Sequence, residues 1–126
     1  IEKAKVRSMA YGIALEIHPL NNLHVLNYLK DDFMANEEKI KSWFSRWVHK
    51  AFEPFEKVLE SDTESGSYCF GDTPTIADIC LFSQVVNNTR FGIDLSKYPR
   101  INNIYENCLK NNSFIKALPK YQPDAE

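Results

Sequence analysis

The chain has 126 residues, of which 44% are apolar, and its 15 Lys and Arg nearly balance 17 Asp and Glu to leave a formal charge of −2. This length supports one globular domain with a single core and excludes two full domains. The charge offers no cationic surface of the kind that binds nucleic acid, and the apolar runs fall far short of the roughly 20 residues that cross a membrane.

The first 28 residues predict two helical pieces separated by a proline. Apolar side chains recur at steps of three and four residues, the period of an amphipathic helix: Val6, Met9, Ile13 and Ile17. Pro19 is expected to break or kink this helix. The stripe resumes over residues 20–28, so a second helical piece should continue at a changed angle.

Residues 37–60 predict the longest helix, because their apolar stripe keeps the helical period over about six turns. Pro54 lies inside this stretch, lacks an amide donor and clashes with the carbonyl four residues back. We therefore expect a bend or a break near residues 50–54. The Asp, Thr, Ser and Gly content of residues 61–71 predicts a loop.

The segment Thr75-Ile76-Ala77-Asp78 is the best local signal in the chain. The Thr75 hydroxyl can accept an amide of the first helical turn while Asp78 reaches back to the amide of Thr75, which is a capping box. The helix that it opens, residues 76–90, is apolar on nearly every side at its start, as expected in the middle of a bundle. Gly92 provides the stop.

The remaining residues predict a helix over residues 99–109, a short helical piece over 113–118 and an extended tail. No alternating strand pattern appears, so the predicted fold class is all-α.

Cys69, Cys80 and Cys108 are odd in number and lie in apolar surroundings, which favours structural thiols in a reducing, cytoplasmic compartment. His18, His24 and His49 form no i,i+4 pair, and no C-x-x-C is present, so no metal is expected. Generic motifs therefore identify no chemistry. The first residue is Ile1, directly before helix-like sequence, and we expect the chain to be a piece of a longer protein.

Three stretches carry a resemblance to a known family: residues 17–23 (IHPLNNL), 68–81 (YCFGDTPTIADICL) and 87–91 (NNTRF). A G-D-x-x-T-x-A-D box resembles glutathione transferases in general, and the I-x-P-L-x-N-L and N-x-x-R-F patterns resemble the zeta class. The end of the chain, residues 121–125, is also similar to that family, so the resemblance covers essentially the whole chain.

The resemblance implies the helical C-terminal domain of such an enzyme over residues 1–126. It also implies a missing N-terminal thioredoxin-like domain that carries a Ser-Ser-Cys motif and most of the glutathione site, so the chain alone should be inactive. The family reaction isomerises the dicarboxylate maleylacetoacetate to fumarylacetoacetate with glutathione as cofactor. The family is dimeric and buries part of its first two helices, so a homodimer is expected.

Four residues are candidates for ligand contacts. The resemblance implies that Arg90 lies near a substrate carboxylate, whereas its position alone also suits a cation that complements a helix C-terminus. Asn21 stands where the family commonly has a Gln that reaches toward glutathione; alternatively, it caps a helical turn. Met9 and Ile13 either line the substrate pocket or belong to the core.

A non-catalytic alternative remains open, namely a transferase-like helical interaction domain of the kind attached to some translation factors and aminoacyl-tRNA synthetases. The N-x-x-R-F arginine favours the enzyme, since an interaction domain has no need of it.

Overall fold

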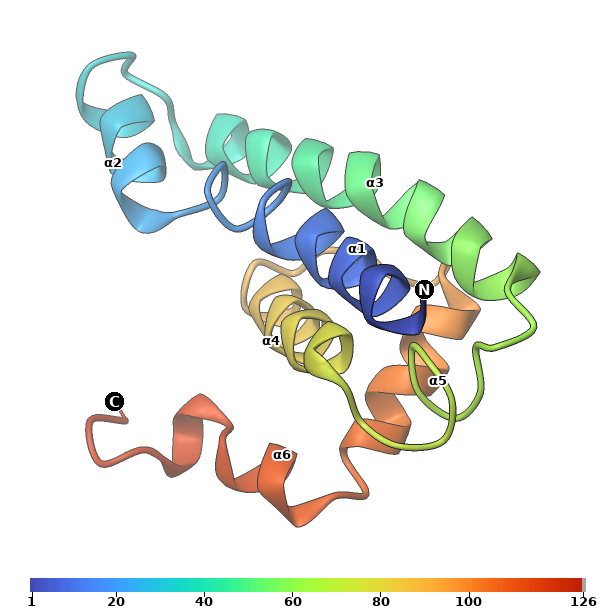
Figure 1. Cartoon of the computed structure of the whole chain (residues 1–126). Coiled ribbons are helices and arrows are strands. Elements are labelled where there is room, and N and C mark those ends of the chain that lie inside the picture. Colours follow the sequence, from blue (N-terminus) through green and yellow to red (C-terminus); the bar gives the residue numbers. More distant parts are fainter. Residues whose placement is uncertain (126) are drawn as a thin grey trace.

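The computed structural model describes residues 1–125, which form helices joined by turns and loops (Figure 1). Its elements in chain order are α1 (Glu2–Ala14), α2 (Leu23–Asp31), α3 (Glu37–Ser61), α4 (Ile76–Arg90), α5 (Pro99–Cys108), α6 (Asn112–Lys116) and a 3-10 turn, η1 (Pro119–Tyr121). No strand occurs within residues 1–125, which confirms the all-α prediction. Helix α1 packs against both α3 and α4, and α5 contacts the same two helices (Figure 1). Buried side chains from all six α-helices form one apolar cluster.

Helix α1 ends at Ala14, three residues earlier than the predicted end and well before Pro19. The proline ring would clash with the carbonyl of Leu15, four residues back, and Leu15 is accordingly the C-cap. Residues 15–21 form turns, so the predicted interruption around Pro19 is confirmed, whereas the second helical piece predicted over residues 20–28 begins only after Asn22. Asn22 caps α2, because its Oδ1 accepts the amide of His24 at 3.2 Å.

Helix α3 runs without interruption through Pro54, so the helix does not break there, and of the two predicted outcomes only a bend stays a prediction. A proline inside a helix costs about 3 kcal/mol. The helix nevertheless continues because one face of α3 is buried along its whole length, with Phe52 and Phe55 on either side of the proline. Burying a large apolar side chain contributes roughly 1.5–3 kcal/mol, so the packing of this face outweighs the local penalty.

The capping box at the start of α4 is confirmed. Thr75 Oγ1 accepts the amide of Ala77 at 3.2 Å. The Asp78 carboxylate is fully buried and uses both oxygens: Oδ2 accepts from the amide and hydroxyl of Thr75, and Oδ1 accepts from the amide of Cys69 at 2.7 Å. Asp78 thus connects the preceding loop to the helix start as well as closing the box.

Helix α4 is less enclosed than its composition predicts. Ile76 and Ile79 are 55% and 59% exposed, although Ala77, Leu81 and Val85 are buried. The most extensive contacts of α4 are with α1 and α5. The apolar side chains of Ile76 and Ile79 remain outside these contacts and form an open apolar face.

A second buried carboxylate caps the N-terminus of α5. Helix α5 has no side-chain cap of its own at Tyr98. Instead, Glu56 of α3, only 5% exposed, accepts the amides of Arg100 at 2.6 Å and Ile101 at 3.0 Å. A carboxylate at a helix N-terminus satisfies amides that have no partner within the helix and complements the helix dipole.

The chain reverses after α4 at Gly92, whose φ of +60° lies in the left-handed region that favours glycine. The predicted helix at 99–109 is confirmed within one residue. The predicted extended tail is wrong at its start, because residues 119–121 form the 3-10 turn η1.

We predict that Asp78→Ala destabilises the chain more than Thr75→Ala. Loss of the Thr75 hydroxyl removes one cap, worth about 1 kcal/mol. Loss of the Asp78 carboxylate leaves the amides of Cys69 and Thr75 without an acceptor, at about 1–3 kcal/mol for a buried group. Urea and thermal unfolding followed by circular dichroism measure both effects, with the exposed Asp31→Ala as control. A wild-type unfolding curve for Asp78→Ala would refute the assignment.

Candidate functional site

Arg90 is the last residue of α4 and is exposed. It lines an open pocket of about 530 Å3 between the end of α4 and the start of α3, which we call the Arg90 pocket. Phe91 and the cations Lys30 and Lys41 line the same pocket, together with Glu37 and Glu38. Arg90 therefore contributes to the wall of a space that can hold a small anion.

An aromatic stack fixes the end of α4 against α3. The rings of Phe91 and Phe44 are nearly parallel, with centroids 3.9 Å apart and an interplanar angle of 10°. Phe44 is fully buried. Because Phe91 directly follows Arg90, this stack sets the position from which the arginine side chain reaches into its pocket.

Asn21 is hydrogen-bonded to Phe44 of α3, the residue whose ring stacks on Phe91. Its Nδ2 donates to the carbonyl oxygen of Phe44 at 3.1 Å, and the side chain is only 6% exposed. Its Oδ1 is buried and has no partner within residues 1–125. Asn21 and Arg90 are therefore linked through Phe44 and Phe91. Asn22, not Asn21, is the residue that caps a helix.

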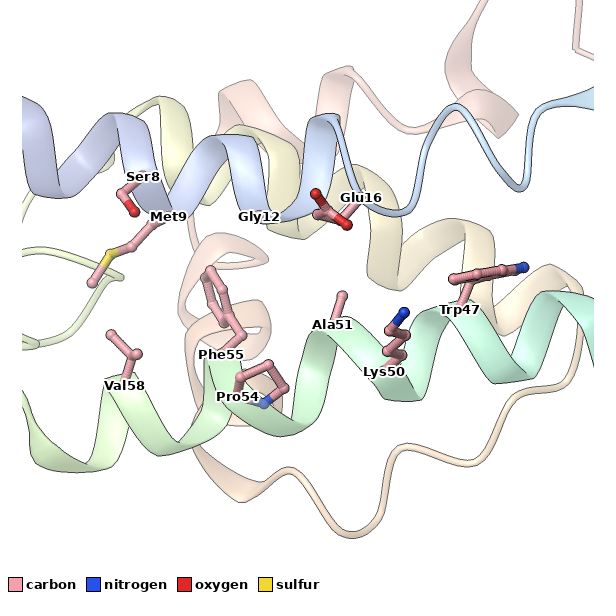
Figure 2. Close-up of a pocket in the computed structure, with 10 residues that line it drawn as sticks. All are labelled: Ser8, Met9, Gly12, Glu16, Trp47, Lys50, Ala51, Pro54, Phe55 and Val58. Atoms are coloured by element: carbon pink, nitrogen blue, oxygen red, sulfur yellow. The ribbon is translucent and has the colours of Figure 1, made fainter.

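Met9 and Ile13 lie elsewhere. Met9 lines a pocket of about 350 Å3 between α1 and α3, together with Ser8 and Gly12 of α1 and Ala51 of α3 (Figure 2). Ile13 is completely buried in the core and lines neither this pocket nor the Arg90 pocket. Arg90 and Asn21 are thus each next to one member of the Phe44–Phe91 stack, whereas Met9 and Ile13 are not. The ligand roles of all four residues stay predictions.

Sequence reasoning missed Lys30 and Lys41 as neighbours of Arg90. Each lies on the polar side of an amphipathic helix, where charged residues are ordinarily solvated, and no local pattern distinguishes them. The stack of Phe91 on Phe44 brings Lys41 to the end of α4, and the packing of α2 on α3 brings Lys30 there.

No thiol in this chain is poised as a nucleophile. Burial raises the pKa of the Cys69 thiol far above its ordinary value, and the neighbouring Asp78 carboxylate adds to the shift. Burial likewise raises the pKa of Cys108 to about 12 and the pKa of Cys80 above its ordinary value. Since the thiolate is the reactive form, all three groups are less reactive at neutral pH than a free cysteine.

His18 and His49 are also shifted toward their neutral forms. Burial lowers the pKa of His18. Burial and the positive charge of Lys97 lower the pKa of His49, whose Nδ1 lies 2.7 Å from the hydroxyl of the buried Tyr98. Within residues 1–125, no three His, Cys, Asp or Glu side chains are grouped closely enough to hold a metal ion. None of the helices in this part of the chain has the length and apolar content to span a membrane.

Comparisons with known proteins identify a family and close relatives. The family model described as "Glutathione S-transferase, C-terminal domain" matches residues 20–120. Maleylpyruvate isomerase of Ralstonia sp is 39% identical over 98% of this chain and 58% of its own length.

Two solved structures show the same arrangement of helices. A holo structure of maleyl pyruvate isomerase, described as a bacterial glutathione S-transferase of the zeta class, superposes with a TM-score of 0.96 at 39% identity, over 98% of this chain and 58% of that one. Maleylacetoacetate isomerase of Anaeromyxobacter dehalogenans, with bound dicarboxyethyl glutathione and citrate, has a TM-score of 0.89 at 30% identity, over 98% of this chain and 54% of that one. The chain therefore spans little more than half the length of these relatives.

We predict that a thiol reagent such as Ellman's reagent labels Cys80 first in the folded chain, because Cys80 is partly exposed whereas Cys69 and Cys108 are buried. Labelling should be slower than that of a free cysteine, since the raised pKa keeps the thiol protonated. Absorbance and peptide mass spectrometry follow the reaction, and all three thiols should react in denaturant. Cys80→Ser is the control. Rapid labelling of Cys69 without denaturant would contradict the predicted order.

Proposed function

Because the chain belongs to the glutathione S-transferase C-terminal domain family, we propose that it is the helical domain of a zeta-class enzyme that isomerises maleylacetoacetate to fumarylacetoacetate with glutathione. The observation that carries this proposal is the similarity of nearly the whole chain to isomerases of maleyl acids. Maleylpyruvate contains the same maleyl group and belongs to the proposed substrate class. With maleylacetoacetate as substrate, the reaction falls late in tyrosine and phenylalanine breakdown.

The active enzyme in this proposal includes an N-terminal thioredoxin-like domain that provides the Ser-Ser-Cys motif and most of the glutathione site. The partial coverage of the relatives supports this domain. So does the open apolar face of α4, where Ile76 and Ile79 are exposed. Beside it, an apolar groove of about 500 Å3 between α4 and α6 is lined by Phe82 and Phe114. A contiguous apolar surface of this kind is suited to being covered by another domain.

Glutathione, when bound, supplies a thiolate that adds reversibly to the conjugated alkene, so that the former double bond can rotate before the thiolate leaves. The task of this chain is to hold the substrate during that rotation. The Arg90 guanidinium presents a planar fork of donors that matches a carboxylate, and the Phe44–Phe91 stack holds its backbone in place. Asn21 is the residue proposed to contact glutathione; its Oδ1 is enclosed in this chain, so the contact requires its side chain to turn outward.

The proposed enzyme is a cytoplasmic homodimer. The three free cysteines fit a reducing compartment. The first two helices carry exposed apolar side chains, such as Tyr11 and Tyr28, that would suit a subunit interface. The alternative of a non-catalytic interaction domain is less well supported, since the relatives reported above are named isomerases.

We predict that, in the complete protein, Arg90→Ala lowers kcat/KM for maleylacetoacetate by about ten- to a hundredfold, the cost of losing a charge-assisted bond of about 1.5–3 kcal/mol. Arg90→Lys should recover only part of the loss, because a point charge does not reproduce the planar fork. The rate is measured as the glutathione-dependent disappearance of the cis substrate. The dissociation constant for glutathione should be the same in both variants as in the wild type. If both variants had the wild-type kcat/KM, Arg90 would not bind the substrate and would serve only as a cation at the end of a helix. A complete protein without any isomerase activity would refute the proposed function.

The chain of 126 residues alone is predicted neither to isomerise a maleyl substrate nor to bind glutathione tightly, because the thiolate-stabilising groups lie in the proposed N-terminal domain. Titration calorimetry with millimolar glutathione checks this. Micromolar binding would show that the glutathione site lies within the helical domain.

A further inference from the structure

A second cation lies beside Arg90. Lys41, in the second turn of α3, lines the Arg90 pocket. Its Nζ lies 3.5 Å from the position that a Cβ on Gly92 would occupy, so the ammonium is next to the turn that follows Arg90. Neither Lys41 nor Arg90 forms an ion pair with a carboxylate in the described part of the chain. Both charges are therefore available to a ligand.

The aromatic stack fixes the placement of the two cations. Lys41 precedes Phe44 by three residues, so both lie on one face of α3. Arg90 directly precedes Phe91, whose ring stacks on Phe44. The backbones of Lys41 and Arg90 are therefore both held close to the Phe44–Phe91 stack. The two side chains line one space of about 530 Å3.

The local charge favours an anion with two negative groups. Of the other charged residues that line the pocket, Lys30 and Glu37 pair with each other at 3.8 Å. Arg90 and Lys41 are then opposed by Glu38 alone, which leaves the lining positive. A positive lining around a concave space raises the local concentration of anions.

We propose that Lys41 binds the second carboxylate of the substrate while Arg90 holds the first. This inference rests on the proposed function and extends it to a residue that sets specificity for dicarboxylates over monocarboxylates. The two side chains suit different tasks. Arg90 offers a fixed planar fork, whereas Lys41 is a point charge on a flexible stem. When the bond between cis carbons rotates to trans, the two carboxylates move relative to each other, and a flexible ammonium can follow one while the fork retains the other.

The test uses the complete protein and two stable glutathione adducts. S-(1,2-dicarboxyethyl)glutathione carries two added carboxylates, and S-(2-carboxyethyl)glutathione carries one. Lys41→Met should weaken binding of the dicarboxylate adduct by about five- to tenfold, as expected for an ion pair that is partly open to water. Binding of the monocarboxylate adduct should change less than about twofold, and Lys41→Arg should retain the preference for two carboxylates because it keeps the charge. Titration calorimetry measures each dissociation constant.

Lys39→Met is the matched control, since Lys39 is exposed on the same helix but does not line the pocket. It should bind both adducts like the wild type, and thermal unfolding should show that all variants are folded. Equal effects of Lys41→Met on the two adducts, or no effect on either, would overturn the inference and leave the proposed function standing. A wild-type protein that binds neither adduct would overturn both.

Discussion

The buried carboxylate of Asp78 is the interaction on which the placement of α4 depends. Its two oxygens accept from Thr75 at the helix start and from the amide of Cys69 in the preceding loop. A carboxylate without exposed surface is costly unless its acceptor sites are used, and here both oxygens are. The direction in which α4 leaves this anchor determines which of its faces packs on α1 and where Arg90 emerges at the other end.

Glu56 performs the corresponding task for α5 from a distant part of the chain. Asp78 lies within the helix that it begins, whereas Glu56 lies in the middle of α3 and accepts two amides of α5. The starts of both helices thus depend on buried acids that are fully engaged in hydrogen bonds. Removing either carboxylate would leave backbone amides without an acceptor in a region that excludes water.

The C-terminal end of α4 is held by an aromatic stack and not by a buried carboxylate. The helix ends against α3 through the parallel rings of Phe44 and Phe91, and the charged side chains next to these rings remain open to solvent. The stacked rings hold the backbone of this surface in place, whereas the side chains of Arg90 and Lys41 beside them can still change conformation. Such a surface suits a substrate whose charged ends move during the reaction.

Local sequence determined the all-α class, the capping box, the span of α4 and the stop at Gly92, because these depend on side-chain period and on contacts within a few residues. The resemblance to a family also made Arg90 a candidate for substrate contact, a role that stays a prediction. Tertiary structure decided the rest. Helix α3 continues through Pro54 because its buried face compensates for the lost bond, and Ile79 stays exposed because no helix within residues 1–125 covers it. Lys41 lies beside Arg90, 49 positions away in sequence, because Phe91 at the end of α4 stacks on Phe44 of α3. Contacts between distant segments leave no periodic signal, so only the packed structure could reveal them.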